Sequence, residues 1–295
     1  MGRGPGGETP LLSRVRMRID ANVKVFSPEF IASRERLVER DLTFKALYDN
    51  PQSRMATAKE LIDAMDRAGI DVSVLASIGW STSDLCRASN DYLLEASDRH
   101  PGRLIPFCSV NPVSGDEAVR EIDRCVRLGA RGVGELHPDW QGYDLGDRTV
   151  MAAVMEAAAR RELPVLTHSS EPAGHVYPGK GLVTPAILYR FVANFPDARI
   201  IMAHWGGGLP FYALMPEVRN AMVNVWFDTA ASPFLYEAGV FEAVASLVGA
   251  DRILFATDYP LIEPDRLLRQ IEQTGLSEEA RDSILGGNAA SLLGL

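Results

Sequence analysis

Eight short apolar segments rich in β-branched residues recur along the 295-residue chain, and amphipathic helical patterns follow most of them. The strand candidates are residues 17–25, 72–78, 103–110, 131–138, 163–170, 199–207, 223–231 and 252–260. The clearest helical patterns cover residues 57–69, 116–129, 151–162, 237–249 and 264–275. Regular alternation of strands and helices predicts an α/β fold with parallel strands. The number of strand and helix pairs favours a single (β/α)₈ barrel of the TIM type over an open, doubly wound sheet.

Two stretches stand outside this alternation. Residues 26–53 carry mixed charges, and we expect them to form an insertion after the first strand that covers the mouth of the barrel. Residues 1–16, rich in glycine and proline, predict a disordered N-terminal tail ahead of a barrel domain at 17–295. No glycine-rich phosphate fingerprint follows the first strand, which argues against a nucleotide-binding Rossmann domain.

The composition narrows the class of partner. A formal net charge of -9, without a cluster of Lys and Arg, argues against nucleic acid and favours a small-molecule substrate. No apolar run is long enough for a membrane span or a secretion signal, and Cys86, Cys108 and Cys125 suit buried free thiols, so we expect a cytoplasmic protein that does not bind membranes. Apolar outer helices would be compatible with a homodimer.

Polar residues end the predicted strands, where a barrel of this type places its active site. The first strand ends in Asn22 and Lys24, and the later ones end in Glu135, His137, His168, His204, Asp228 and Asp258. The chain has five histidines, and three of them stand at strand ends, while His175 lies in the loop after the fifth strand. We expect Asp228 to support the site from behind and the other residues to form it.

Several motifs in this order resemble the amidohydrolase-related (amidohydrolase 2) family of the amidohydrolase superfamily. They are "LTHSSEPAGHVYPGKG", "IIMAHWGGGLPFYALMPEV", "DTAASPFLY", "ILFATDYP" and the closing "GLSEEARDSILGGNAASLLGL", and the resemblance runs from about Arg18 to Leu295. The family includes decarboxylases, hydratases, lactonases and carbon-carbon hydrolases. The resemblance implies that His168 binds a metal, that His204 lies beside the reacting group, and that Asp258 binds metal and moves protons. It also implies His-x-His at the end of the first strand.

This chain has Asn22-Val23-Lys24 where the family pattern has His-x-His. Zinc needs three or four nitrogen, sulfur or carboxylate ligands, and an ammonium group repels a divalent ion. We therefore predict no cofactor and no tightly bound catalytic zinc, with a weak divalent-metal site at His168, Asp258 and Glu135 as the disfavoured alternative. Lys24 would take the vacated space, either holding a substrate oxyanion or only forming an ion pair with Asp258.

The resulting prediction is a metal-independent hydrolase acting on an activated ester, lactone or acyl bond of a small carboxylated or cyclic substrate. The lactonase branch of the family is known for metal-independent hydrolysis, and this prediction resembles that activity. Asp258 would be the general base, His204 and His168 its proton or oxyanion partners, and Lys24 the fixed positive charge. Residues expected to contact the substrate are Asn22, Glu135, His137, His175, Tyr177, Lys180 and Trp205.

Three other readings stay open on the same residues. A decarboxylase or lyase would use Lys24 to bind the developing anion. A metal-dependent hydrolase would need an atypical metal site. A pseudoenzyme would keep the pocket and bind a ligand without turnover.

Overall fold

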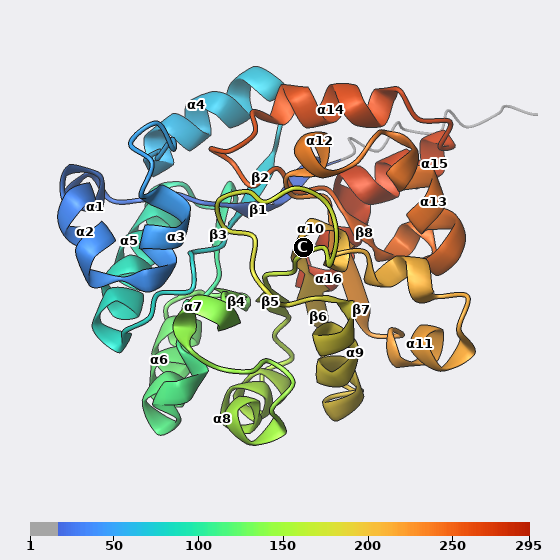
Figure 1. The fold of residues 1–295 in the computed structure, drawn as a ribbon. Helices are drawn as coiled ribbons and strands as arrows, with labels where there is room; N and C mark the ends of the chain where they lie inside the picture. The colour runs from blue at the N-terminus through green and yellow to red at the C-terminus, as the bar shows by residue number, and fades with distance from the viewer. Residues whose placement is uncertain (1–16) are drawn as a thin grey trace, which may run out of the picture.

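The computed structural model describes residues 17–295, so the predicted tail at 1–16 lies outside the described residues. The chain folds as a (β/α)₈ barrel, which confirms the predicted fold class. In Figure 1 the strands lie in the middle of the molecule and the helices surround them. Every helix in the described part of the chain is too short or too polar to cross a lipid bilayer.

Within residues 17–295 the eight strands are shorter than the sequence patterns that predicted them. They are β1 (Ile19–Val23), β2 (Val72–Leu75), β3 (Leu104–Pro106), β4 (Val133–Leu136), β5 (Val165–Thr167), β6 (Ile200–Met202), β7 (Val225–Asp228) and β8 (Ile253–Leu254). All pairs are parallel, in the orders β1-β2-β3 and β4-β5-β6-β7-β8. Parallel bridges from Cys108 to Val133 and from Val23 to Tyr259 join the two sheets at both seams.

Helices connect the strands around the outside. The α-helices are α1 (Pro28–Ala32), α2 (Arg34–Arg40), α3 (Leu42–Tyr48), α4 (Ala58–Ala68), α5 (Ser83–Arg99), α6 (Asp116–Arg127), α7 (Pro138–Gln141), α8 (Arg148–Ala159), α9 (Pro185–Asn194), α10 (Ala203–Gly206), α11 (Pro216–Ala221), α12 (Ser232–Leu235), α13 (Gly239–Val248), α14 (Pro264–Glu272), α15 (Glu278–Asp282) and α16 (Asn288–Leu293). Short turns of other helix types are η1 (Pro112–Ser114), η2 (Leu209–Tyr212), η3 (Ala250–Arg252) and η4 (Ser283–Gly287).

Local sequence signals explain the helix ends. Thr57 caps α4 through a capping box with Glu60, and Gly69 ends the helix with a left-handed φ of 68°. A left-handed residue at this position favours glycine, which has no Cβ to clash. The helix predicted at 57–69 is therefore confirmed, including its glycine stop.

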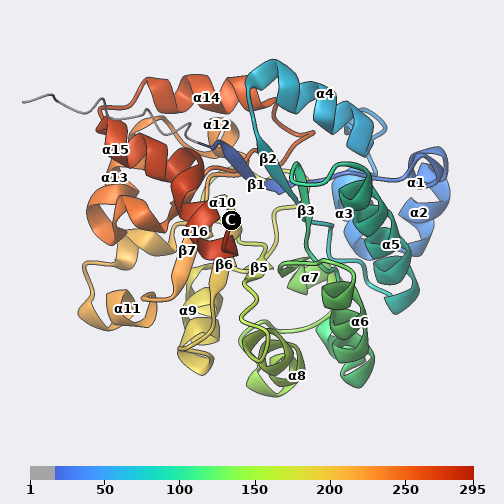
Figure 2. The same cartoon turned by 180° about the vertical axis from the view of Figure 1, so that it is seen from behind.

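Apolar side chains fill the barrel interior below the polar strand ends. Ile19, Leu166, Ile201 and Leu254 belong to one buried cluster and expose 2% of their surface or less. Helix α16 packs on β1 and β8 and lies at the centre of the view from behind in Figure 2. Because this end of the interior is closed by packing, access to the interior is from the opposite end.

The predicted insertion after β1 forms α1, α2 and α3, which lie together at one side of the barrel in Figure 1. Aromatic stacking anchors it, since the Phe44 ring stacks on Trp80 at 5.6 Å and on Tyr48 at 5.0 Å. The Thr43 hydroxyl donates to the Gly79 carbonyl at 2.6 Å. These contacts fix the end of α3 against the loop after β2.

Candidate active site

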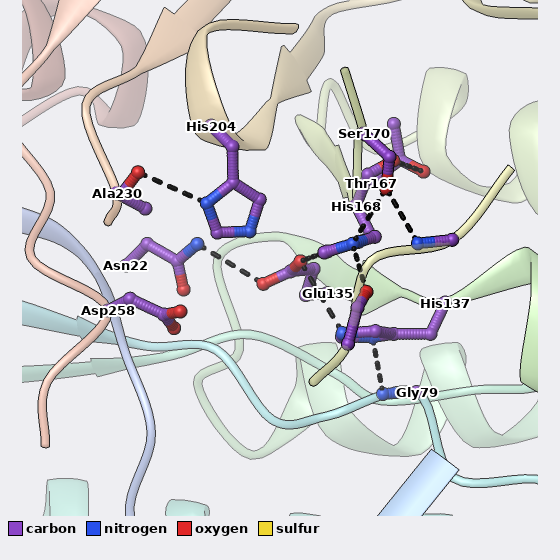
Figure 3. Close-up of polar contacts among 12 residues, drawn as sticks. Asn22, Gly79, Glu135, His137, Thr167, His168, Ser170, His204, Ala230 and Asp258 are labelled. Atoms are coloured by element: carbon purple, nitrogen blue, oxygen red, sulfur yellow. Dashed lines mark hydrogen bonds and ion pairs between the residues drawn. The ribbon is translucent and has the colours of Figure 1, made fainter. Parts of the chain in front are cut away.

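Eight polar side chains from six strand ends converge at the open end of the barrel, and we call them the floor. They are Asn22, Lys24, Glu135, His137, His168, His204, Asp228 and Asp258. Figure 3 labels those other than Lys24 and Asp228. Strand side chains two residues apart share a face, so Asn22 and Lys24 both point to the same interior space. The strand-end residues predicted from the sequence are thus brought together.

A buried ion pair between Lys24 and Glu135 lies at the centre of the floor. The ammonium lies 2.7 Å from Glu135 Oε2 and 3.5 Å from Asp258 Oδ1, and it also donates to the Asn22 side-chain carbonyl. Burial alone lowers the pKa of Lys24, but the charges of Glu135 and Asp258 outweigh it and raise the pKa above its usual value. Burial raises the pKa of Glu135, and Lys24, His137 and His168 more than reverse this, so that its pKa falls. Lys24 therefore stays cationic and Glu135 stays anionic.

His137 is held in one tautomer. Its Nδ1 accepts a hydrogen bond from the Gly79 amide at 3.0 Å, so Nε2 carries the proton and faces Glu135 Oε1 at 3.6 Å. Burial lowers the pKa of His137 to about 3, which keeps the ring neutral. The ring stacks on His168 with 4.8 Å between centroids.

Both ring nitrogens of His168 face acceptor atoms. Nδ1 lies 3.0 Å from Glu135 Oε1, and Nε2 lies 3.1 Å from the Gly179 carbonyl. The Ser170 hydroxyl also lies 3.4 Å from Nε2, so Nδ1–H can donate to Glu135 while Nε2 accepts from this hydroxyl.

Asp228 is a fully buried member of the floor that contacts other floor residues and does not line the cavity. Its carboxylate accepts from the His204 and Ala230 amides at 2.9 and 3.0 Å and from Asn22 Nδ2 at 3.0 Å. His204 in turn donates Nδ1–H to the Ala230 carbonyl at 3.1 Å, which leaves Nε2 turned away from this bond. Burial alone lowers the pKa of His204, but the charges of Asp258, Glu135 and Asp228 raise it overall.

Four residues just after consecutive strands have left-handed backbones. They are His204 (φ 55°) and Trp205 (φ 58°) after β6, Ala231 (φ 57°) after β7 and Asp258 (φ 60°) after β8. Non-glycine residues rarely adopt such angles, and they concentrate at functional sites. The strained positions agree with the location of the floor.

A cavity of about 610 Å³ opens above the floor. Six floor residues line it, namely Lys24, Glu135, His137, His168, His204 and Asp258. Its sides, which we call the wall, include Leu47 and Tyr48 from α3, His175 and Tyr177 from the loop after β5, and Phe234 and Leu235 from α12. The volume is typical of a site for a small organic molecule.

Three predicted substrate contacts lie away from the cavity surface. Asn22 lies beneath Lys24, and its amide bridges Glu135 and Asp228. Trp205 is fully buried and donates to the Ser232 hydroxyl at 3.0 Å. The Lys180 ammonium bonds the carbonyls of Ala173 and His175 at 2.7 and 3.0 Å within its own loop. Their roles in substrate binding remain predictions.

Several wall residues were not predicted from the sequence. Leu47, Tyr48 and Arg54 reach the cavity from the insertion and the segment that follows it. The signal available was the insertion itself, which was predicted to cover the mouth. Its individual residues carried no strand-end position that would have marked them.

One group in the described part of the chain is suited to a divalent metal. Ligand atoms of Glu135, His168 and His204 lie within 4.8 Å of one another, and all three side chains are buried. Two imidazoles and a carboxylate are ligands that first-row transition metals accept. The disfavoured metal site predicted from the sequence consisted of His168, Asp258 and Glu135. The group in the structure has His204 in place of Asp258.

Known proteins resemble the chain over most of its length. It is 26% identical to a gamma-resorcylate decarboxylase of Polaromonas sp. (strain JS666 / ATCC BAA-500), covering 93% of this chain and 99% of that protein. It is 23% identical to a 2-amino-3-carboxymuconate-6-semialdehyde decarboxylase of Dictyostelium discoideum, covering 79% and 76%. A solved 5-carboxyvanillate decarboxylase of Novosphingobium aromaticivorans, with bound manganese, superposes with a TM-score of 0.78 at 20% identity, covering 96% and 98%.

These findings correct two predictions. The hydrolase prediction is wrong, because the relatives are decarboxylases. The prediction of a metal-independent site without a cofactor is also wrong, because solved relatives hold manganese and the chain gathers a Glu-His-His group. The absence of the His-x-His pair was given too much weight. Glu135, His168 and His204, which come from three other strands, were not considered together as one set of metal ligands.

The family model described as amidohydrolase matches residues 19–295, which is nearly the whole described part of the chain. The match agrees with the barrel, with the convergence of strand-end histidines and carboxylates, and with the motifs quoted above. The chain therefore belongs to the amidohydrolase family.

Proposed function

We propose that this protein is a metal-dependent decarboxylase that acts on a small, hydroxylated aromatic or unsaturated carboxylate. The observation that carries the proposal is the floor, which combines a Glu-His-His group with Asp258 at one cavity. Relatives that match most of the chain bear decarboxylase names, which supports this reaction over hydrolysis.

Decarboxylation without an oxidant requires a proton at the carbon that loses the carboxylate. The carbon-carbon bond breaks, its electron pair stays on the substrate carbon, carbon dioxide leaves, and a proton takes its place. Asp258 is suited to relay this proton, because its side chain is 17% exposed and lines the cavity. Lys24, 3.5 Å away, holds a positive charge beside it.

Glu135, His168 and His204 would hold the metal ion. A bound divalent ion would polarise substrate oxygens and stabilise negative charge that develops on them. His137 keeps a neutral N–H directed at Glu135, and Asp228 fixes the His204 backbone, so both maintain the ligand arrangement. Lys24 also pairs with Glu135, which limits how far this carboxylate moves.

Carbon dioxide release from a panel of hydroxybenzoates and carboxymuconate-type acids tests the proposal. Purified protein, with its metal content measured by elemental analysis, should release carbon dioxide from at least one member and lose this activity on chelation. Manganese should restore it. A panel that yields hydrolysis products but no carbon dioxide would contradict the proposal.

Glu263→Gln provides a control for the loss of a carboxylate at the same cavity. Glu263 lies at the rim and pairs with Arg54 rather than with the floor. We expect this variant to lose less than about tenfold in activity, because a surface ion pair contributes little. Glu135→Gln should lose both activity and bound metal.

A further inference from the structure

Tyr48, the last residue of α3, has a hydroxyl that no described residue uses. The side chain lines the cavity, and the residue exposes 8% of its surface. Within residues 17–295 its hydroxyl makes no hydrogen bond with protein, although it is not sealed in by protein atoms. The hydroxyl is therefore available to a water molecule or to a ligand in the cavity.

The Tyr48 ring cannot easily turn its hydroxyl elsewhere. It stacks on Phe44 at 5.0 Å and meets the Phe26 ring edge-on at 5.1 Å. Phe44 is itself stacked on Trp80, so the ring belongs to a rigid aromatic group. The hydroxyl is therefore held in place before any ligand arrives.

The surroundings keep this hydroxyl protonated. Burial raises the pKa of Tyr48, and the nearby charges of Asp258 and Glu135 raise it further. A protonated hydroxyl can donate, and Tyr48 lines the same cavity as Glu135 and Asp258 of the floor. Lys24, which lines the same cavity, supplies the positive charge that an anionic acceptor needs there.

The hydroxyl of a second cavity tyrosine, Tyr177, differs from that of Tyr48 because it already has a partner. Tyr48 and Tyr177 are the two tyrosines among the described residues that line the cavity. The Tyr177 hydroxyl already donates to Glu171 at 2.7 Å. Tyr48 alone of this pair has a donor left for a ligand.

We infer that Tyr48 is a specificity residue whose hydroxyl donates a hydrogen bond to an anionic oxygen of the substrate, a phenolate or a carboxylate, beside Lys24. The inference rests on the proposed function, which supplies a substrate of this class. It adds a residue of the insertion to a site otherwise built from strand ends.

A binding measurement tests this without relying on turnover. The probe is 3-methoxy-4-hydroxy-5-nitrobenzoic acid, which is bound in a solved relative and whose ionised nitrophenol absorbs visible light. The full-length protein, with its metal content measured, is titrated with the probe. Tyr48→Phe should weaken binding about tenfold, the effect expected for a hydrogen bond to a charged acceptor.

Tyr143→Phe is the matched control. The Tyr143 hydroxyl is also buried without a partner, but it lies outside the cavity lining. This variant should bind the probe as the wild type does. Repeating both titrations with 3-methoxy-5-nitrobenzoic acid identifies the acceptor: a tenfold loss for the hydroxylated probe alone identifies the phenolate, and a loss for both probes identifies the carboxylate.

Equal affinities of wild type and Tyr48→Phe for both probes would overturn the inference. Failure of the wild type to bind either probe at millimolar concentration would also overturn it. The proposed function fails separately, if the wild type binds the probe normally but releases no carbon dioxide from the carboxylate panel.

Discussion

The floor and the wall of the cavity differ in how their polar groups are satisfied. In the floor, Lys24 contacts Asn22, Glu135 and Asp258, and Asp228 accepts from two backbone amides. In the wall, the Tyr48 hydroxyl makes no hydrogen bond with another described residue. Floor residues that bond one another are preorganised for chemistry, whereas the unused Tyr48 donor in the wall is suited to selecting a ligand.

This difference predicts that floor substitutions abolish the reaction and wall substitutions change affinity. The largest effect should come from Asp258→Asn, which is nearly isosteric and removes the proposed proton relay. We expect carbon dioxide release to fall roughly 10²–10⁴-fold. Circular dichroism should show an unchanged fold, and full activity in this variant would exclude Asp258 from proton transfer.

Lys24→Met tests whether the floor is held together by its buried ion pair. In metal-free protein the variant leaves Glu135 charged and without its cationic partner, with 1% of its side chain exposed. The free energy of unfolding should fall by about 3–5 kcal/mol, measured by urea denaturation. Adding Glu135→Gln should recover part of this loss, because the second change removes the unpaired charge. An unchanged stability in Lys24→Met would show that the pair does not stabilise the fold.

Asp20, beneath the floor, should make stability depend on pH. Burial raises its pKa to about 7, although Thr257 donates to it through its amide at 3.0 Å and its hydroxyl at 2.6 Å. The folded state then holds a proton that the unfolded state has released, so stability falls as pH rises from about 4 to 7. The integrated effect is roughly 4 kcal/mol.

Asp20→Asn removes this titration while keeping the shape of the side chain. Urea unfolding at several pH values should give a flatter profile between pH 4 and 7 than in the wild type. If the free energy of unfolding changed with pH equally in the two proteins, the pH dependence would not come from Asp20.

The smallest effect should come from Lys180→Met in the loop above the wall. The ammonium bonds two carbonyls of its own loop, so its loss should loosen the loop that carries His175 and Tyr177. We expect KM for the carboxylate substrate to rise a few fold and kcat to change less. A change confined to kcat would place Lys180 at the reacting bond.

Strand ends explain why the floor could be predicted from the sequence. Glu135, His168, His204 and Asp258 each end an apolar run, and barrel geometry brings such positions together. Tyr48 could not be found in this way, because its place depends on how the insertion packs on Trp80.

The metal and the reaction were predicted wrongly for a related reason. The sequence shows which ligands are missing from β1, but not that Glu135 approaches His168 to 3.0 Å. Spacing along one strand is visible in a sequence, whereas the distance between two strand ends is set by tertiary packing.

Isotope incorporation tests the proposed decarboxylation most directly. The reaction of the metal-loaded wild type with a carboxylate that it consumes is run in D₂O containing H₂¹⁸O. We predict a product that carries one deuterium at the carbon that bore the carboxylate, seen by NMR. Mass spectrometry should show that no ¹⁸O from solvent has been added to the product. A product that contains solvent ¹⁸O and retains its carboxylate would contradict decarboxylation and return the protein to hydrolysis or hydration.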